Sequence, residues 1–320
     1  MSYMFRALLV FLAMAANSFA APDGYVLVLN KASNSLSYIN GNSLKVDGPE
    51  VAVGRQPHEM AITPDGRKAY VSNVGSNSLS VVDLKGRREM KAINSPDFQF
   101  PHGVAFTKDG RQAIVTSEQR KKIIIIDAGR DEIRRTFDTN QEGTHMIVLS
   151  PDGRWAYLTN RVSNTVSIMD VPKMEIAANV PVGKGAEGLA LSPDGKQLWV
   201  GNRGENTVTV VDVLKRQTIA TLPAGEAPIR VAFSPDGKLA FVSNSNSADV
   251  YVYDAATRKP VKTVAVGGSP GGVIISPDGE RAFVACGAAD EVDVIDVATL
   301  KVVSKIPVGK GPDGLAYWRN

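Results

Sequence analysis

The chain has 320 residues, of which 43% are hydrophobic, and its 36 basic and 33 acidic side chains give a net charge of +3. The basic residues are scattered along the sequence, so no basic stripe for nucleic-acid binding is expected. Cys286 is the only cysteine, which excludes an internal disulfide and favours a buried, small apolar side chain at that position.

The N-terminal segment has the pattern of a secretory signal peptide. Arg6 precedes the apolar run ALLVFLAMAA, and small side chains follow at Ser18 and Ala20. This pattern predicts cleavage after Ala20. The apolar run is too short for a stable membrane anchor. We therefore expect residues 1–20 to be removed, residues 21–320 to form a single domain without a membrane span, and the protein to be periplasmic or secreted.

A repeat of 42 to 44 residues runs through the rest of the chain. The tetrad SPDG or a close variant ends at Gly66, Gly110, Gly153, Gly195, Gly237 and Gly279. Each tetrad is followed by a short apolar strand, a polar turn, a strand ending in Asp and a fourth segment. Period and strand count predict a four-stranded propeller blade, and no helix is expected after the signal segment.

The two ends of the chain complement each other. Residues 24–40 match the second and third strands of a unit, whereas residues 311–318 match the first strand. Together with the six complete units, they predict an all-β, seven-bladed β-propeller with a composite closing blade. Such a closure leaves no open sheet edge.

The repeat also resembles a known family. The YVSN and YLTN segments, the SPDG turns and the period are similar to those of the YVTN-repeat seven-bladed β-propellers. The resemblance covers the chain after the signal segment and implies an exported protein. It leaves the function open, because this fold hosts binding scaffolds, lactonases, lyases and accessory proteins of redox enzymes.

All three histidines of the chain occupy one register of the repeat, eight residues before the tetrad glycine. The column contains His58, His102, His145, Glu187, Ile229 and Gly271, and the final unit contributes Asp313. Rotation about the propeller axis brings equivalent positions together at the channel. The alternative to a functional site is a structural role, in which each histidine forms a hydrogen bond within its own blade.

Two kinds of chemistry fit this column. Three imidazoles with flanking carboxylates are typical of a transition-metal site. The metal hypothesis assigns His58, His102, His145, Glu187 and Asp313 as ligands of Zn, Fe, Cu or Mn, between which the sequence does not choose. The metal-free hypothesis rests on a resemblance to propeller lactonases and cycloisomerases, which implies His145, Glu187 and Arg230 as a catalytic set.

A second register follows the Asn that ends the second strand of each unit. Its charged members, expected to contact a cofactor or ligand, are Lys31, Glu118, Arg161 and Arg203. The positive ones favour a small anionic molecule, although exposed loop charges explain them equally well. Glu59, next to His58, is a further candidate acid.

Two functions remain open at this point. The first is a ligand or metal site at the channel mouth, serving a lyase, a lactonase or a metal-assisted hydrolase that acts on a small anionic substrate. The second is a non-catalytic periplasmic scaffold or accessory protein of a redox or transport system. In both cases we expect a monomer that does not bind nucleic acid.

Overall fold

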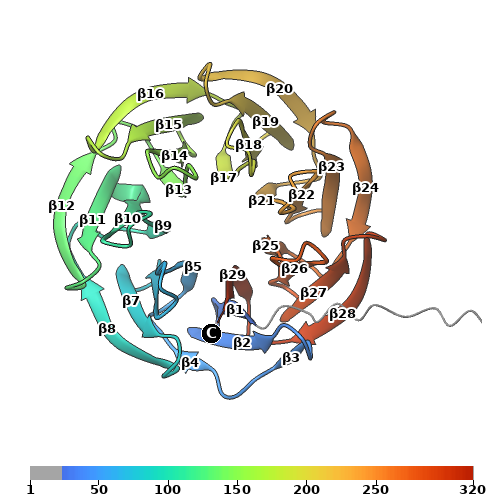
Figure 1. Ribbon diagram of the computed structural model, residues 1–320, viewed down its shortest axis with the longest axis horizontal. Helices are drawn as coiled ribbons and strands as arrows, with labels where there is room; N and C mark the ends of the chain where they lie inside the picture. The colour runs from blue at the N-terminus through green and yellow to red at the C-terminus, as the bar shows by residue number, and fades with distance from the viewer. Residues whose placement is uncertain (1–23, 320) are drawn as a thin grey trace, which may run out of the picture.

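The computed structural model describes residues 24–319, which form a ring of seven antiparallel sheets around a central channel (Figure 1). This arrangement confirms the predicted all-β, seven-bladed propeller. Among the described residues the sole helical element is a 3-10 turn, η1 (Glu118–Arg120). None of their helices has the length and apolarity to cross a membrane. The predicted signal segment, residues 1–20, lies outside the described residues.

The first three blades follow each other along the chain, and each runs from the channel outward. Blade 1 comprises β5 (Pro57–Ile62), β6 (Lys68–Asn73), β7 (Ser78–Asp83) and β8 (Arg88–Asn94). Blade 2 comprises β9 (Pro101–Phe106), β10 (Gln112–Ser117), β11 (Lys122–Asp127) and β12 (Glu132–Asp138). Blade 3 comprises β13 (Thr144–Leu149), β14 (Trp155–Asn160), β15 (Thr165–Asp170) and β16 (Glu175–Pro181).

The next three blades repeat this order. Blade 4 comprises β17 (Ala186–Leu191), β18 (Gln197–Asn202), β19 (Thr207–Asp212) and β20 (Gln217–Pro223). Blade 5 comprises β21 (Pro228–Phe233), β22 (Leu239–Asn244), β23 (Asp249–Asp254) and β24 (Pro260–Ala265). Blade 6 comprises β25 (Pro270–Ile275), β26 (Arg281–Cys286), β27 (Glu291–Asp296) and β28 (Lys301–Pro307).

The closing blade joins both ends of the chain, as the sequence predicted. Its strands are β29 (Pro312–Trp318), β1 (Tyr25–Asn30), β2 (Ser35–Asn40), β3 (Lys45–Val46) and β4 (Val51–Ala52). The innermost strand β29 pairs antiparallel with β1, and the outer edge of β2 is covered by the two short strands β3 and β4. The ring is therefore closed by backbone hydrogen bonds between segments almost 300 residues apart.

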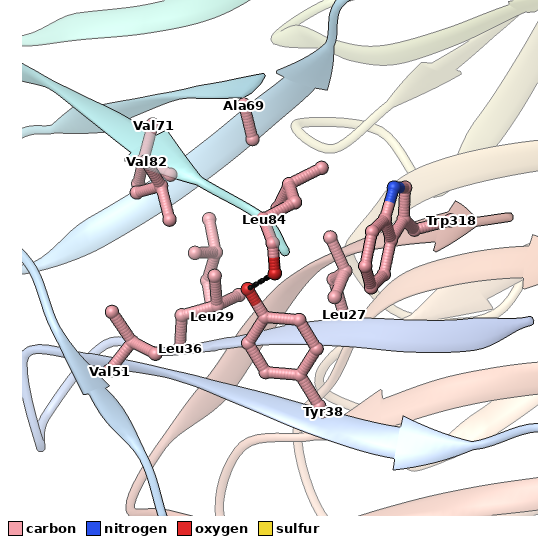
Figure 2. Packing of buried hydrophobic residues seen from close by; sticks show 10 residues of the cluster. All are labelled: Leu27, Leu29, Leu36, Tyr38, Val51, Ala69, Val71, Val82, Leu84 and Trp318. Carbon is pink, nitrogen blue, oxygen red and sulfur yellow. Dashed lines mark hydrogen bonds between the residues drawn. The ribbon is translucent and has the colours of Figure 1, made fainter. Parts of the chain in front are cut away.

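Apolar packing fastens the closing blade to blade 1 (Figure 2). Trp318 is buried in this cluster, and its indole Nε1–H donates to the carbonyl of Gly66 at 2.7 Å. Tyr38, also buried, donates its hydroxyl to the carbonyl of Leu84 at 3.2 Å. Each bond satisfies the one polar group of a large buried side chain, so the contact gains apolar burial without a desolvation penalty.

The repeated tetrads form the turns between the first and second strands. In blade 3, Asp152 Oδ1 accepts the backbone N–H of Arg154 at 2.9 Å, and Gly153 has a φ of 75°. The glycine is required because that φ lies in the left-handed region. These turns lie at the opposite end of the inner strands from the histidine column. Cys286 is fully buried, as expected, and burial raises the pKa of its thiol to about 12.

Candidate functional site

The histidine column lies at a local irregularity of the inner strands. In blade 1 the pairing of β5 with β6 shifts between Pro57 and Glu59, so His58 stands in a bulge. The same shift surrounds the equivalent position in the other six blades. A bulge turns a side chain away from the regular pleat. It thereby aims the column side chains into the channel.

Hydroxyl groups of neighbouring blades fix the backbone of this column. Ser72 Oγ donates to the carbonyl of His102 at 2.6 Å, and Thr159 Oγ donates to that of Glu187 at 2.7 Å. Thr116 holds the carbonyl of His145 in the same way. The donors are the third residues of the YVTN-type segments. Ser or Thr at this place of the repeat is therefore a sequence signal for the backbone position of the column.

The three imidazole rings meet in the channel. The ring centroids of His58 and His102 lie 4.2 Å apart, and those of His102 and His145 lie 3.5 Å apart. His102 is completely buried, and neither of its ring nitrogens has a hydrogen-bond partner within the described part of the chain. Burial, reinforced by the two neighbouring imidazoles, lowers the pKa of His102 well below its usual value, so this ring is neutral.

His58 is paired with a carboxylate from the closing blade. Its Nδ1 lies 2.6 Å from Asp313 Oδ2, while its Nε2 lies 3.5 Å from Lys31 Nζ. Burial works to raise the pKa of Asp313, but His58 and Arg230 outweigh it, and the pKa of this carboxyl is lowered. An ionised Asp313 therefore orients the His58 ring and leaves Nε2 as the nitrogen available for chemistry.

His145 has a carboxylate at each ring nitrogen. Its Nδ1 lies 2.6 Å from Glu118 Oε2, and its Nε2 lies 3.3 Å from Glu187 Oε1. Burial works to lower the pKa of His145, yet the two carboxylates outweigh it, and the pKa is raised. Burial likewise works to raise the pKa of Glu187, but His145 and Arg161 lower it to about 2. The group is a buried imidazolium between two carboxylates.

Arg161 joins the same two carboxylates from outside. Its Nε lies 2.7 Å from Glu187 Oε2, and its Nη1 lies 3.2 Å from Glu118 Oε1. Glu118 begins the 3-10 turn η1, which replaces the regular turn between β10 and β11. Blades 2, 3 and 4 are therefore linked at the channel by one network of two cations and two carboxylates.

A further ion pair crosses the channel. Arg230 of blade 5, whose side chain is only 9% exposed, donates to Glu59 Oε1 of blade 1. Burial works to lower the pKa of Arg230, but Glu59 and Asp313 raise it, so the guanidinium stays charged. Glu59 therefore faces a cation 171 residues away in the chain rather than supporting its neighbour His58.

A cavity of about 430 Å³ opens beside this network. His58, Asp313, Lys31, Arg203 and Arg230 line one part of it. The remaining wall consists mainly of small residues, which include Ser245, Ser269, Gly271, Gly287 and Gly311. His102, His145, Glu118 and Arg161 do not line this cavity. A small molecule in the cavity therefore meets His58, three cations and the carboxylates of Asp313 and Glu187, but not His145.

The expected ligand sets are brought together in part. The ligand atoms of His58, Glu59 and His102 all lie within 4.8 Å of one another. His58 and His102 belong to the metal-ligand set predicted from the sequence, whereas Glu59 does not. In the catalytic set, His145 contacts Glu187, whereas Arg230 pairs with Glu59. Of the four charged residues expected to contact a ligand, Lys31 and Arg203 line the cavity. The assigned roles stay predictions.

Residues 139–276 match the family model described as lactonase, 7-bladed beta-propeller. This match covers less than half of the chain, and it agrees with the seven-bladed propeller that the structure shows. Among solved structures, the propeller is similar to a chain of hydrazine synthase from Kuenenia stuttgartiensis, with 26% identity, a TM-score of 0.79 and coverage of 87% of this chain and 94% of that one.

A functionally unknown protein from Desulfotomaculum acetoxidans also superimposes on the propeller, with a TM-score of 0.79 over 92% of this chain and 99% of that one. Because only 14% of the residues are identical, this likeness concerns the fold alone. No curated protein matches the sequence.

Proposed function

We propose that the propeller hydrolyses a small anionic lactone or ester in the cavity at the channel mouth. The observation that carries this proposal is the Asp313–His58 pair, because it lines a cavity that three cationic side chains also line. The cavity of about 430 Å³ has the size of a small-molecule site. The lactonase family model, which matches residues 139–276, supports the reaction class.

His58 is the general base of the proposed reaction. Its Nε2 takes a proton from water while the water oxygen bonds to the carbonyl carbon, and the C=O π electrons move onto the carbonyl oxygen. The carbonyl then forms again as the bond to the leaving oxygen breaks, and that oxygen receives the proton from His58. Asp313 holds the ring through Nδ1 and stabilises its protonated form.

The surrounding charges support a metal-free reaction with an anionic substrate. Three carboxylates at the channel already have a close cationic partner. The pairs are Glu59–Arg230, Glu118–Arg161 and Glu187–Arg161. A divalent metal ion competes with these cations for the same oxygens. A substrate carboxylate, by contrast, is attracted by the cations that line the cavity.

One observation favours a second candidate, metal-assisted hydrolysis. The ligand atoms of His58, Glu59 and His102 lie within 4.8 Å of one another, and Asp313 Oδ2 lies 2.6 Å from His58 Nδ1. A carboxylate behind a ligating histidine is a common arrangement at metal sites. Zn, Fe, Cu or Mn held there would lower the pKa of a bound water. Glu59 would then share its carboxylate between the metal and Arg230 or release Arg230.

A pair of chromogenic esters tests the proposal. We expect the purified chain to hydrolyse mono-4-nitrophenyl adipate faster than 4-nitrophenyl hexanoate, which has the same length without the charge. His58→Ala lowers the rate by about 10²- to 10⁴-fold, the range of a lost general base, and Asp313→Asn also lowers it. Arg111→Met, an exposed cation at the opposite end of the inner strands, leaves the rate unchanged.

Elemental analysis separates the two candidates. Protein purified without chelator contains no stoichiometric transition metal if the reaction is metal-free. One equivalent of metal that is lost in His102→Ala supports the metal-assisted reaction instead. If the protein neither hydrolyses the esters nor contains metal, the non-catalytic scaffold is the remaining hypothesis. It is tested by measuring whether the chain captures a protein partner.

A further inference from the structure

Two of the cavity-lining cations are only loosely paired. Lys31 Nζ lies 3.5 Å from Asp313 Oδ2, and Arg203 Nη1 lies 3.6 Å from Glu187 Oε1. Charge-assisted hydrogen bonds are normally about 2.7 to 2.9 Å long. Both carboxylates make shorter contacts elsewhere, Asp313 with His58 and Glu187 with Arg161. Lys31 and Arg203 therefore have donor capacity to spare.

The other two arginines at the channel, Arg230 and Arg161, already form close ion pairs with carboxylates. Arg230 is 9% exposed and donates to Glu59. Arg161 is clamped between two carboxylates and does not line the cavity. The Lys31 and Arg203 side chains, by contrast, are 36% and 43% exposed and both line the cavity. An anionic ligand finds its free donors on these two residues.

Lys31 and Arg203 lie on different sides of the cavity. Each follows the Asn that ends the second strand of its blade, Asn30 in the closing blade and Asn202 in blade 4. These blades are three steps apart in the ring, and seven-fold rotation separates equivalent positions by about 154°. Lys31 lies next to the His58 base, with Nζ 3.5 Å from its Nε2, whereas Arg203 belongs to a blade on the far side of the ring.

We propose that Lys31 and Arg203 have different roles towards one substrate. Lys31 stabilises the oxyanion that forms on the carbonyl attacked beside His58, and Arg203 binds a carboxylate at the far end of the molecule. The substrate is then an ester or lactone whose carboxylate is several bonds away from the reacting carbonyl. This inference rests on the proposed hydrolysis, and it adds the position of the substrate charge.

The wall between the two cations suits such a molecule. Gly271, Gly287 and Ser269 belong to this wall and project little or no side chain into the cavity. At Gly271 a Cβ atom would lie 2.9 Å from Asp313 Oδ1, so the absence of a side chain keeps the space beside the reacting pair open. A flexible substrate chain is accommodated between the base and Arg203.

Kinetics of the two esters separate the roles. Lys31→Met lowers kcat by about 10²- to 10³-fold with KM little changed, because an oxyanion interaction exists only in the transition state. Arg203→Met raises KM for mono-4-nitrophenyl adipate on the order of 10- to 100-fold. It leaves 4-nitrophenyl hexanoate unaffected, since that ester lacks the carboxylate. Arg203→Lys restores part of the affinity, and Arg111→Met serves as the control for removal of a cation.

Equal effects of Arg203→Met on the two esters, or an effect of Lys31→Met on KM alone, would overturn the assignment. Calorimetry with unreactive ligands keeps the test independent of turnover. Adipamic acid, which carries the carboxylate, binds the wild type and loses affinity in Arg203→Met, whereas hexanamide shows no difference between the two. If this result holds but no ester is hydrolysed, the carboxylate site stands and the proposed hydrolysis fails.

Discussion

The channel mouth has two unlike sides. From the closing blade to blade 4, the column positions carry Asp313, three imidazoles and Glu187. His58 and His145 contact carboxylates, whereas the buried His102 has no hydrogen-bond partner within the described residues. In blades 5 and 6 the same positions carry Ile229 and Gly271, and a cavity lies beside them. The backbone is repeated on both sides. The side chains at the column positions therefore determine which side of the channel mouth is filled and which side contains the cavity.

The stability of the filled side depends on every buried charge having its partner. We therefore expect the largest stability loss from substitution of His145, which contacts two buried carboxylates. His145→Ala removes the buried cation between Glu118 and Glu187 and leaves Arg161 as the cation that they share, and we expect a loss of about 3 to 5 kcal/mol in the free energy of unfolding. The matched change on the open side, Ile229→Ala, removes a half-buried apolar side chain at a cost of about 1 to 2 kcal/mol. Urea unfolding of both variants measures the difference. Equal losses would mean that the network contributes no more than ordinary packing.

The open side depends on the absence of side chains. Gly271→Ala adds a Cβ atom 2.9 Å from Asp313 Oδ1, so the carboxylate must move away from its place beside His58. We expect a stability loss of about 1 to 3 kcal/mol and a roughly tenfold slower hydrolysis of the adipate ester.

Ser269→Ala, also in the cavity wall but without added volume, is the control for Gly271→Ala. Unchanged hydrolysis in Gly271→Ala would show that the exact position of Asp313 does not matter for the reaction. In that case the cavity would have to be assigned to binding rather than to catalysis.

The repeat predicted which residues meet at the channel mouth, because rotational symmetry places the same register of each blade at an equivalent position around the axis. Aligning the tetrads is enough to bring His58, His102 and His145 together, and aligning PDGLAYW with PHGVAFT places Asp313 with them. The split closing blade followed in the same way from the unmatched ends of the chain. Both results depend on backbone position alone, which the repeat fixes.

Side-chain pairing could not be predicted from the register. Glu59 neighbours His58 in sequence, yet it reaches across the channel to Arg230. The register assigns Glu118 to ligand contact and gives no sign of its contact with His145 Nδ1, which the turn η1 makes possible. Which cation takes which carboxylate depends on rotamers and on charges from several blades at once. The repeat does not encode these choices.

Raising the pH is expected to lower the stability of the filled side gradually, because His145 loses its proton. The pKa of His145 is raised in the folded state, so the stability from its proton is fully present below the usual histidine pKa and is lost as the pH rises through the raised value. Urea midpoints of the wild type should fall as the pH rises through this raised pKa. His145→Gln should lack this part of the pH dependence. A parallel fall in both proteins would exclude His145 as the titrating group.

The smallest effect is expected where the two sides meet. Arg203 is 43% exposed and 3.6 Å from Glu187, so Arg203→Met should change the free energy of unfolding by no more than about 0.5 kcal/mol. Arg161→Met, which removes the closer partner of the same carboxylate, should cost clearly more because it also leaves Glu118 short of a cation. Urea unfolding of the two variants compares them directly. If Arg203→Met were as destabilising as Arg161→Met, Arg203 would belong to the solid network and would not be free to bind a substrate carboxylate.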